Sequence, residues 1–286
     1  NTMKKYFFPV SAALCLATIG IFTKLIGNSV NPFTTSFYRV FIGLIFLFPF
    51  FFFGKSGKNL LKIEHAKSLF VLGVILSLNF SVYLSALQFA PVTNVVPIFY
   101  TYPIFVCFLS HIFLKEKISR NFIFSILMAL AGIVLINYPF EMGSYMVGNG
   151  LAVLSGLVYA SFLVYLRYDE NLNRSSLYPM FWAMFFAVII LSPTLLITGP
   201  GDLSGYTIYW VLGIGIISTG LGYGFSSISL KVTEAHKFSA INTIFEPLTS
   251  ILLAIIILSE SPGILTSIGA MFLIVSGLVV YKEMSR

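Results

Sequence analysis

Charged residues are scarce in this 286-residue sequence, at 9 % of the total, and acidic residues number only ten. Soluble proteins average about 25 % charged residues. Apolar residues make up 58 % of the chain, and the mean hydropathy is +0.95, which is more apolar surface than one soluble core can bury. The scarcity of charge therefore excludes an ordinary soluble domain and predicts an integral membrane protein.

Cysteine and histidine are also rare. The two cysteines, Cys15 and Cys107, lie in apolar stretches, where a small packing role is favoured over a disulfide. The three histidines show no paired spacing with cysteine that would indicate a structural metal site. We therefore expect no metal and no cofactor.

Long apolar stretches fill the chain between short polar breaks. A bilayer core takes about 20 helical residues per crossing, and barrel strands are disfavoured because the stretches are continuously apolar rather than alternating. The sequence therefore predicts an all-α integral membrane protein with ten transmembrane helices. The predicted spans are residues 6–26, 33–53, 68–88, 92–113, 120–138, 148–166, 177–198, 207–227, 237–258 and 264–281.

The two halves of the chain repeat one pattern at an offset of 144 residues. Pro103 is followed thirteen residues later by Glu116, and Pro247 is followed thirteen residues later by Glu260. Because each half has an odd number of spans, the second half enters the membrane from the opposite side, which is the inverted-repeat plan of secondary transporters. We predict an N-terminal five-helix repeat over residues 1–140 and an inverted C-terminal repeat over residues 141–286.

The net charge of +7 is explained by topology rather than by a nucleic-acid surface. With the N-terminus in the cytoplasm, 15 of the 17 Lys and Arg residues fall on the inner side, and only Lys24 and Arg39 do not. This bias is the positive-inside pattern. It predicts a multi-pass protein of the cytoplasmic membrane with both termini in the cytoplasm.

Two charged residues lie inside the predicted spans. Glu246 is ten residues into the ninth span, about 15 Å deep at about 1.5 Å per residue, and an intramembrane acid is a functional hypothesis by default. Arg39 lies within the second span and is the natural partner, through an ion pair or a shared substrate. The alternative is that Arg39 extends to the outer surface and Glu246 only caps neighbouring helix groups.

Aromatic and amide side chains accompany these charges in the spans and suit a small amphipathic ligand. Each tyrosine alone is more often a packing or interface residue, so the group carries the prediction; Tyr100 also lies among these aromatic residues. The candidates for substrate or proton binding are Arg39, Glu246, Tyr38, Asn79, Tyr83, Asn94, Tyr102, Tyr159, Trp182, Tyr223 and Asn242.

Three segments of the chain form a recognisable pattern: Phe37-Tyr38-Arg39-Val40, Pro103 leading to Leu114-Lys115-Glu116-Lys117, and Phe245-Glu246-Pro247 leading to Leu258-Ser259-Glu260. With these segments the chain resembles, over its full length, the EamA family of the drug/metabolite transporter superfamily. The resemblance implies a ten-helix carrier of amino acids or related metabolites, often exchanged for protons. It also implies a central cavity formed by spans one to four and six to nine, with spans five and ten peripheral. Thr18-Ile19-Gly20 departs from the tryptophan that many relatives carry before the glycine.

The sequence thus predicts a secondary active transporter, not an enzyme, that moves a small organic solute by alternating access. Arg39 would bind an anionic group, and Glu246 an amino group or a coupling proton. Lys115, Glu116 and Lys117 belong to an inner-surface connector outside the site. Membrane lipids are expected partners, and both a monomer and a homodimer remain open.

Other functions stay as alternatives. A multidrug or organic-cation exporter of the same architecture is the first. A channel would need a continuous polar stripe, and the spans show scattered polar residues instead. An intramembrane enzyme would need a nucleophile with a base, or clustered acidic and histidine ligands, and no such cluster is visible in the sequence.

Overall fold

The computed structural model describes residues 2–52, 66–90, 92–136, 138, 145–170, 177–258 and 263–284, and these ranges form helices joined by short connectors, with no strand among them. Glu260 and the predicted boundary between the halves near residue 140 lie outside the described residues. The helices are α1 (Thr2–Ile26), α2 (Pro32–Phe52), α3 (Ala66–Phe89), α4 (Val92–Phe99), α5 (Tyr102–Leu114), α6 (Arg120–Ile136), α7 (Met146–Glu170), α8 (Tyr178–Leu191), α9 (Pro193–Thr198), α10 (Thr207–Gly213), η3 (Ile214–Leu221), α11 (Gly222–Val232), α12 (Ala235–Leu258) and α13 (Ile264–Met284).

Helices occupy all ten predicted ranges, with ends that differ by a few residues. Seven of the described helices are long and apolar enough to cross a membrane, and three shorter apolar helices cover Tyr102–Leu114, Arg120–Leu135 and Ser267–Val279. The prediction of an all-helical membrane protein is confirmed. Ten crossings and the inverted repeat stay predictions.

The fourth predicted span differs from the expected single helix, because it consists of α4 and α5 with a break at Tyr100 and Thr101. Pro103 lies in the first turn of α5. Its ring has no N–H to donate and would clash with the carbonyl of Phe99, four residues earlier, if one helix continued. The seventh span is likewise divided, into α8 and α9, where Pro193 follows Ser192.

The eighth span contains a wider helical turn. Between α10 and α11, residues Ile214–Leu221 form a π-helix, η3, a winding that is rare and frequent at functional sites. The hydroxyl of Thr219 donates to the carbonyl of Ile214, five residues earlier, at 2.8 Å. Helix α2 packs closely on this segment: a Cβ added at Gly215 would lie 2.5 Å from Ile42. Small residues permit such close contact between transmembrane helices.

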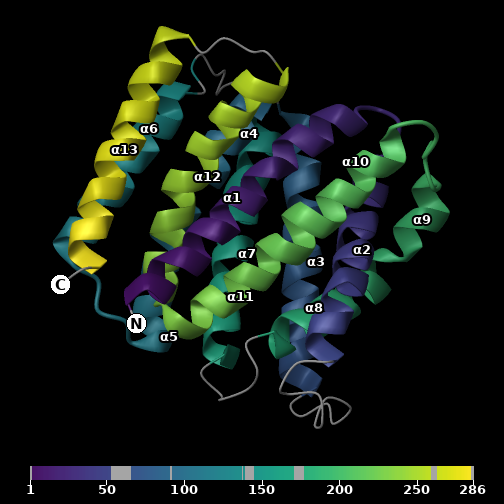
Figure 1. Cartoon of the computed structure of the whole chain (residues 1–286), viewed down its shortest axis with the longest axis horizontal. Coiled ribbons are helices and arrows are strands. Elements are labelled where there is room, and N and C mark those ends of the chain that lie inside the picture. Colours follow the sequence, from purple (N-terminus) through teal and green to yellow (C-terminus); the bar gives the residue numbers. More distant parts are fainter. Residues whose placement is uncertain are drawn as a thin grey trace.

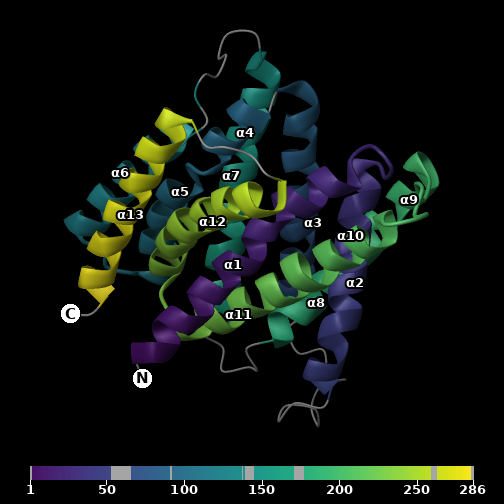
Figure 2. The same cartoon turned by 45° about the horizontal axis from the view of Figure 1, so that its top comes forward.

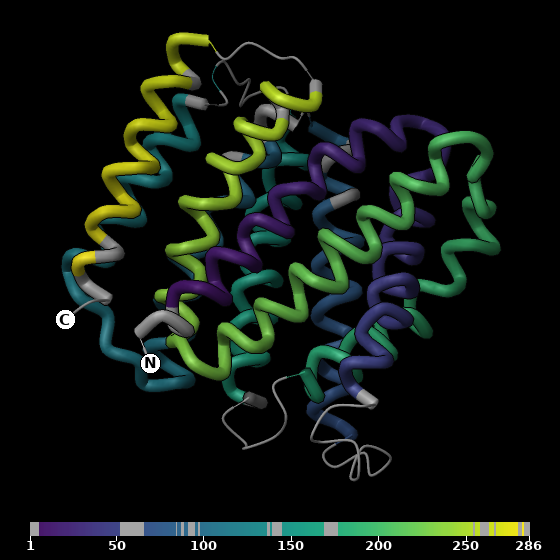
Figure 3. Tube along the Cα trace, viewed as in Figure 1, coloured from purple at the N-terminus to yellow at the C-terminus, as the bar shows by residue number. Residues whose placement is uncertain are grey.

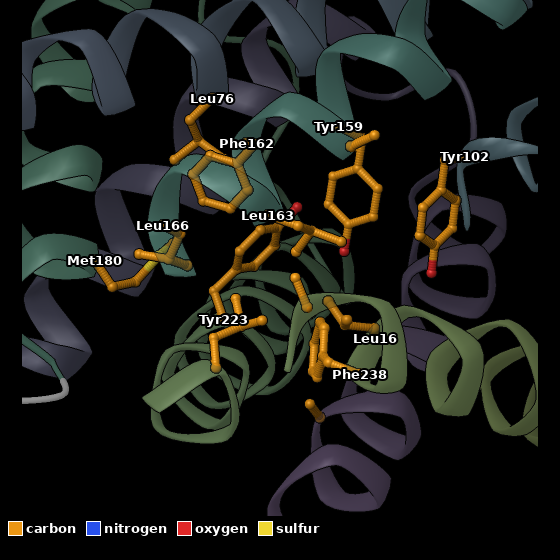
Figure 4. Close-up of a cluster of buried hydrophobic side chains, with 14 of the residues drawn as sticks. Leu16, Leu76, Tyr102, Tyr159, Phe162, Leu163, Leu166, Met180, Tyr223 and Phe238 are labelled. Carbon is orange, nitrogen blue, oxygen red and sulfur yellow. The ribbon is translucent and has the colours of Figure 1, made fainter. Parts of the chain in front are cut away.

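Helices from the two parts of the chain interleave around one core (Figures 1 and 2). Helix α3 packs on α7 and α8, α1 packs on α11 and α12, and α2 packs on η3 and α8. Helices α6 and α13 pack against each other at one edge of the molecule, as the tube view also shows (Figure 3). In the close-up of the core, Tyr102, Tyr159, Phe162, Tyr223 and Phe238 converge from α5, α7, α11 and α12 (Figure 4).

Basic residues are concentrated at the helix ends and connectors of one end of the bundle. Figure 1 shows the N- and C-termini at that same end. The described helix ends and connectors there carry Lys67, Lys115, Lys117, Arg120, Arg167, Lys231, Lys237 and Lys282. At the other end, the described residues include Lys24 near the end of α1 and the acidic Asp202 in the connector before α10. Among the described residues, the basic side chains are therefore concentrated at one end of the bundle and are scarce at the other.

Candidate substrate-binding site

Arg39 of α2 points into the bundle and is only 8 % exposed. Its Nε donates to the hydroxyl of Thr219 in η3 at 3.3 Å, and its guanidinium carbon lies 4.8 Å from the ring centroid of Phe80 on α3. Nη2 is buried and has no hydrogen-bond partner among the described residues. A guanidinium held by one hydrogen bond and one ring therefore keeps donors free for an anionic group.

Glu246 of α12 lies deep among the helices, yet its side chain is partly accessible. The hydroxyl of Tyr100, at the break between α4 and α5, is within hydrogen-bonding reach of the carboxylate. The described residues show no contact ion pair between Glu246 and Arg39, whose charges interact at longer range. Two opposite charges thus share the interior without neutralising each other directly.

Aromatic rings connect the surroundings of these two charges, and we call them the aromatic cluster. Phe99 is central, with ring centroids 5.0 Å from Tyr83 and 5.5 Å from both Tyr102 and Tyr159. Rings continue from Tyr159 to the side of Arg39 at successive distances of 6.4, 6.1 and 6.0 Å. The cluster consists of Phe80, Tyr83, Phe99, Tyr100, Tyr102, Tyr159, Phe162 and Tyr223.

The five tyrosines of the cluster all interact electrostatically with Glu246. Tyr83 and Tyr223 also interact with Arg39. Tyr102 is joined to α12 directly, because its hydroxyl accepts from Thr243 at 3.4 Å and donates to the carbonyl of Ser239 at 3.5 Å. The structure therefore brings Arg39, Glu246 and four predicted tyrosines into one region.

The remaining predicted residues lie in different surroundings. Tyr38 donates to the carbonyl of Pro200 at 2.9 Å, at the end of the bundle that carries Asp202. Trp182 packs against Phe181, Phe185 and Phe186 around α8, and its indole nitrogen is buried without a partner among the described residues.

The structure describes the side chains of two of the three predicted asparagines. Asn242 is fully buried one turn before Glu246 on α12, and neither of its amide atoms has a partner in the described part of the chain. Asn79 is buried beside Phe80 with its carbonyl oxygen unpaired there. Asn94 lies in α4, but its side chain is outside the described part of the structure.

Sequence reasoning missed Phe80 and Phe99, which contact Arg39 and the tyrosines. The sequence-based candidates were chosen for polar groups within the spans, and a phenylalanine side chain has no polar group. The available signal was helical spacing, because Phe80 precedes Tyr83 by three residues and so lies on the same face of α3.

Glu116 lies outside this region, in the connector between α5 and α6. Its Oε1 accepts from the backbone N–H of Ala235 at 2.9 Å, and its Oε2 lies 2.7 Å from Nδ1 of His236, at the start of α12. Burial alone would raise the pKa of Glu116, but the hydrogen bonds from His236 and Ala235 outweigh burial and lower it below its ordinary value of 4.5. Glu116 therefore acts as a cap for α12. Among the described residues, no group of three or more His, Cys, Asp or Glu side chains could hold a metal ion.

Comparison with known proteins identifies the family. The model of the EamA-like transporter family matches residues 3–138 and again residues 146–282. The chain belongs to the EamA-like transporter family. A solved crystal structure, described only as that of a protein, has the same fold, with a TM-score of 0.87 and 17 % identity over 99 % of this chain and 98 % of that one.

Relatives of this EamA-like chain are also transporters by name. An uncharacterized transporter of Clostridium kluyveri is 28 % identical over 98 % of this chain and 94 % of its own length. An uncharacterized transporter of Archaeoglobus fulgidus is 22 % identical over 96 % and 95 %. An S-adenosylmethionine uptake transporter of Rickettsia felis is 31 % identical over 34 % of this chain and 33 % of its own. These comparisons support a transporter and leave its substrate open.

Proposed function

We propose that this EamA-like protein is a secondary active transporter that moves a small organic solute across the cytoplasmic membrane by alternating access. The observation that carries the proposal is the pair of opposite charges, Arg39 and Glu246, held apart in the interior beside a continuous aromatic cluster. Charged side chains at membrane depth are costly and mark transport pathways. A zwitterionic solute has a negative group that can pair with Arg39 and a positive group that can pair with Glu246.

The proposed substrate class is amino acids and related metabolites. The free Nη2 of Arg39 is suited to a substrate carboxylate, and the carboxylate of Glu246 to an amino group or a coupling proton. The aromatic cluster offers flat faces to an apolar or cationic body. S-adenosylmethionine, named for the Rickettsia relative, is one solute of this kind, because it combines an amino-acid group with a sulfonium cation and an adenine ring.

An organic-cation exporter is the second candidate function. A partly accessible carboxylate among five tyrosines favours it, because tyrosine faces and a carboxylate both attract cations. The two functions differ in their need for Arg39, which an amino acid would use and a simple cation would not.

The experiment is uptake into proteoliposomes of labelled amino acids, S-adenosylmethionine and organic cations, with and without a pH gradient. Glu246→Gln removes the charge at nearly constant volume, and we expect it to lower initial uptake at least ~10-fold, equivalent to about 1.4 kcal/mol. The matched control is Glu234→Gln, which changes a half-buried acid, paired with Lys237, in the connector before α12 and should leave uptake unchanged. Uptake by Glu246→Gln at the wild-type rate would contradict the proposal.

Arg39→Gln separates the two candidate functions. For an amino-acid carrier, this variant should lose uptake of zwitterionic solutes by a similar factor. For a cation exporter, the variant should keep cation transport while the wild type fails to move amino acids.

A further inference from the structure

An apolar groove lies on the outer surface of the bundle between α5 and α6. Helix α5 packs against α7 and α12, and α6 packs against α13 and α12. The groove has a volume of about 460 Å³ and is lined by Ile104, Cys107, Phe108 and His111 of α5 and by Ile123 and Leu127 of α6. Cavities of about 300–1,000 Å³ hold small ligands.

The groove opens toward the surroundings of the protein rather than toward the aromatic cluster. Phe108 is 64 % exposed and Leu127 is 55 % exposed, although both are large and apolar. In a membrane protein such side chains face lipid tails. The groove is therefore separate from the region around Arg39 and Glu246 and plays no part in the proposed substrate site.

One end of the groove meets the basic connector between α5 and α6. Ile118 of this connector lines the groove. Close to Ile118 in the sequence are three exposed basic residues, Lys115, Lys117 and Arg120. His111, on the groove wall, is held to the connector because its Nδ1 lies 3.0 Å from the carbonyl of Glu116. The basic side chains thus lie at the rim where the apolar surface ends.

Among the side chains that the structure describes, these three cations have no acidic partner. Glu116, the acid within the connector, is turned inward to the start of α12, and Glu234 is paired with Lys237 at 2.5 Å. In the described part of the chain, no ion pair or hydrogen bond involves the side chains of Lys115, Lys117 or Arg120. An apolar groove with an unneutralised basic rim complements an anionic molecule with a long apolar tail.

We propose that this groove binds an anionic phospholipid, with an acyl chain between α5 and α6 and the phosphate headgroup at Lys115, Lys117 and Arg120. Basic pockets between helices at the inner surface attract anionic lipid headgroups. A second copy of the chain does not fit this surface, because a two-fold contact would bring two basic rims together.

The test is native mass spectrometry of protein released from vesicles of phosphatidylethanolamine with or without phosphatidylglycerol. The wild type should retain phosphatidylglycerol in preference to phosphatidylethanolamine. Combined Lys115→Gln, Lys117→Gln and Arg120→Gln substitutions should lower the retained phosphatidylglycerol about tenfold and abolish the preference. The matched control removes three other bases from the same end of the bundle, through Lys67→Gln, Lys237→Gln and Lys282→Gln, and should keep it.

A second variant tests the acyl-chain part of the site. Ile123→Trp with Leu127→Trp fills the groove from α6, and it should lower the retention of both lipids while leaving the melting temperature in detergent near that of the wild type. Cys107 adds a readout on the unaltered groove: with Cys15→Ser, its alkylation by a lipid-soluble maleimide should be slower in the vesicles that contain phosphatidylglycerol.

Four results would overturn the inference. Equal losses in the rim variant and its control would show a diffuse surface charge rather than a site. Unchanged lipid retention in the filled groove, or equal alkylation of Cys107 in both kinds of vesicle, would show that no lipid occupies it. A dimer mass that the filled-groove variant loses would assign the groove to a second copy.

Discussion

Glu116 shows how one side chain can hold several segments together. From the connector after α5 it caps the first backbone N–H groups of α12, and its Oε1 also lies 3.9 Å from Nε of Arg167 near the end of α7. The guanidinium of Arg167 in turn donates to the carbonyl of Leu230 near the end of α11. Glu116 and Arg167 together therefore link the connector after α5 with α7, α11 and α12 at the basic end of the bundle.

We predict that Glu116→Gln destabilises the protein by about 1–3 kcal/mol at neutral pH, the usual cost of losing a buried hydrogen bond to a charged group. The folded-state pKa of Glu116 lies below 4.5, so its contribution is present above that value and is lost as the pH falls through the folded pKa. Melting temperatures in detergent should therefore differ at pH 7 and converge as the pH falls below 4.5. Glu234→Gln, which changes the half-buried acid just before α12, serves as the control. A constant difference across this range would argue against the assignment.

At the scale of helices, the pairing of α6 with α13 depends on one close backbone contact. A Cβ added at Gly132 of α6 would lie 2.6 Å from the carbonyl oxygen of Gly269 on α13. The hydroxyl of Ser276 donates to the carbonyl of Ser125 across the same pair at 2.7 Å. Because the contact at Gly132 is with backbone, no rotamer change can relieve it.

We predict that Gly132→Ala lowers the melting temperature in detergent, by an amount equivalent to about 1–3 kcal/mol, the usual cost of overpacking. Gly20→Ala on α1 is the matched control, because nothing lies within 4 Å of a Cβ at that position. An equal effect of both substitutions would indicate a general cost of changing glycine rather than the contact of α6 with α13.

The helices were largely predictable because a bilayer imposes their length, whereas the breaks within them were not. Pro103 and Pro193 lie at the starts of new helices, but Pro49 and Pro247 lie inside unbroken α2 and α12. A proline in the sequence therefore does not by itself determine whether a helix divides. The π-helix at Ile214–Leu221 also had no recognisable sequence signal.

The site was predictable to the extent that its residues are chemically rare in a membrane. Arg39 and Glu246 were identifiable because a charged side chain inside the membrane is energetically costly and therefore rare unless it has a function. Helical spacing from Tyr83 was a weak signal for Phe80 among the 30 phenylalanines of the chain, because the packing of α3 against its neighbours is what brings it to Arg39. The substrate-binding role of all these residues stays a prediction.

At the scale of the whole molecule, the gathering of basic residues at one end predicts that this end faces the cytoplasm. In a Cys15→Ser, Cys107→Ser background, a membrane-impermeant maleimide should label Asp202→Cys in intact cells. Lys67→Cys and Lys282→Cys should react only after the membrane is opened. The opposite labelling pattern would reverse the orientation, and labelling of all three in intact cells would show that the reagent had entered.

The π-helix η3 also changes the direction in which the side chains of α11 point around the helix axis. In an α-helix each residue advances about 100° around the axis, and a π-type insertion changes the azimuth of every side chain that follows it. Tyr223 comes two residues after η3 and meets Phe80 and Phe162 at its observed angle. The direction in which Tyr223 and the rest of α11 point around the helix axis is therefore set by the winding of the preceding π-helix, and not only by the residues that they contact.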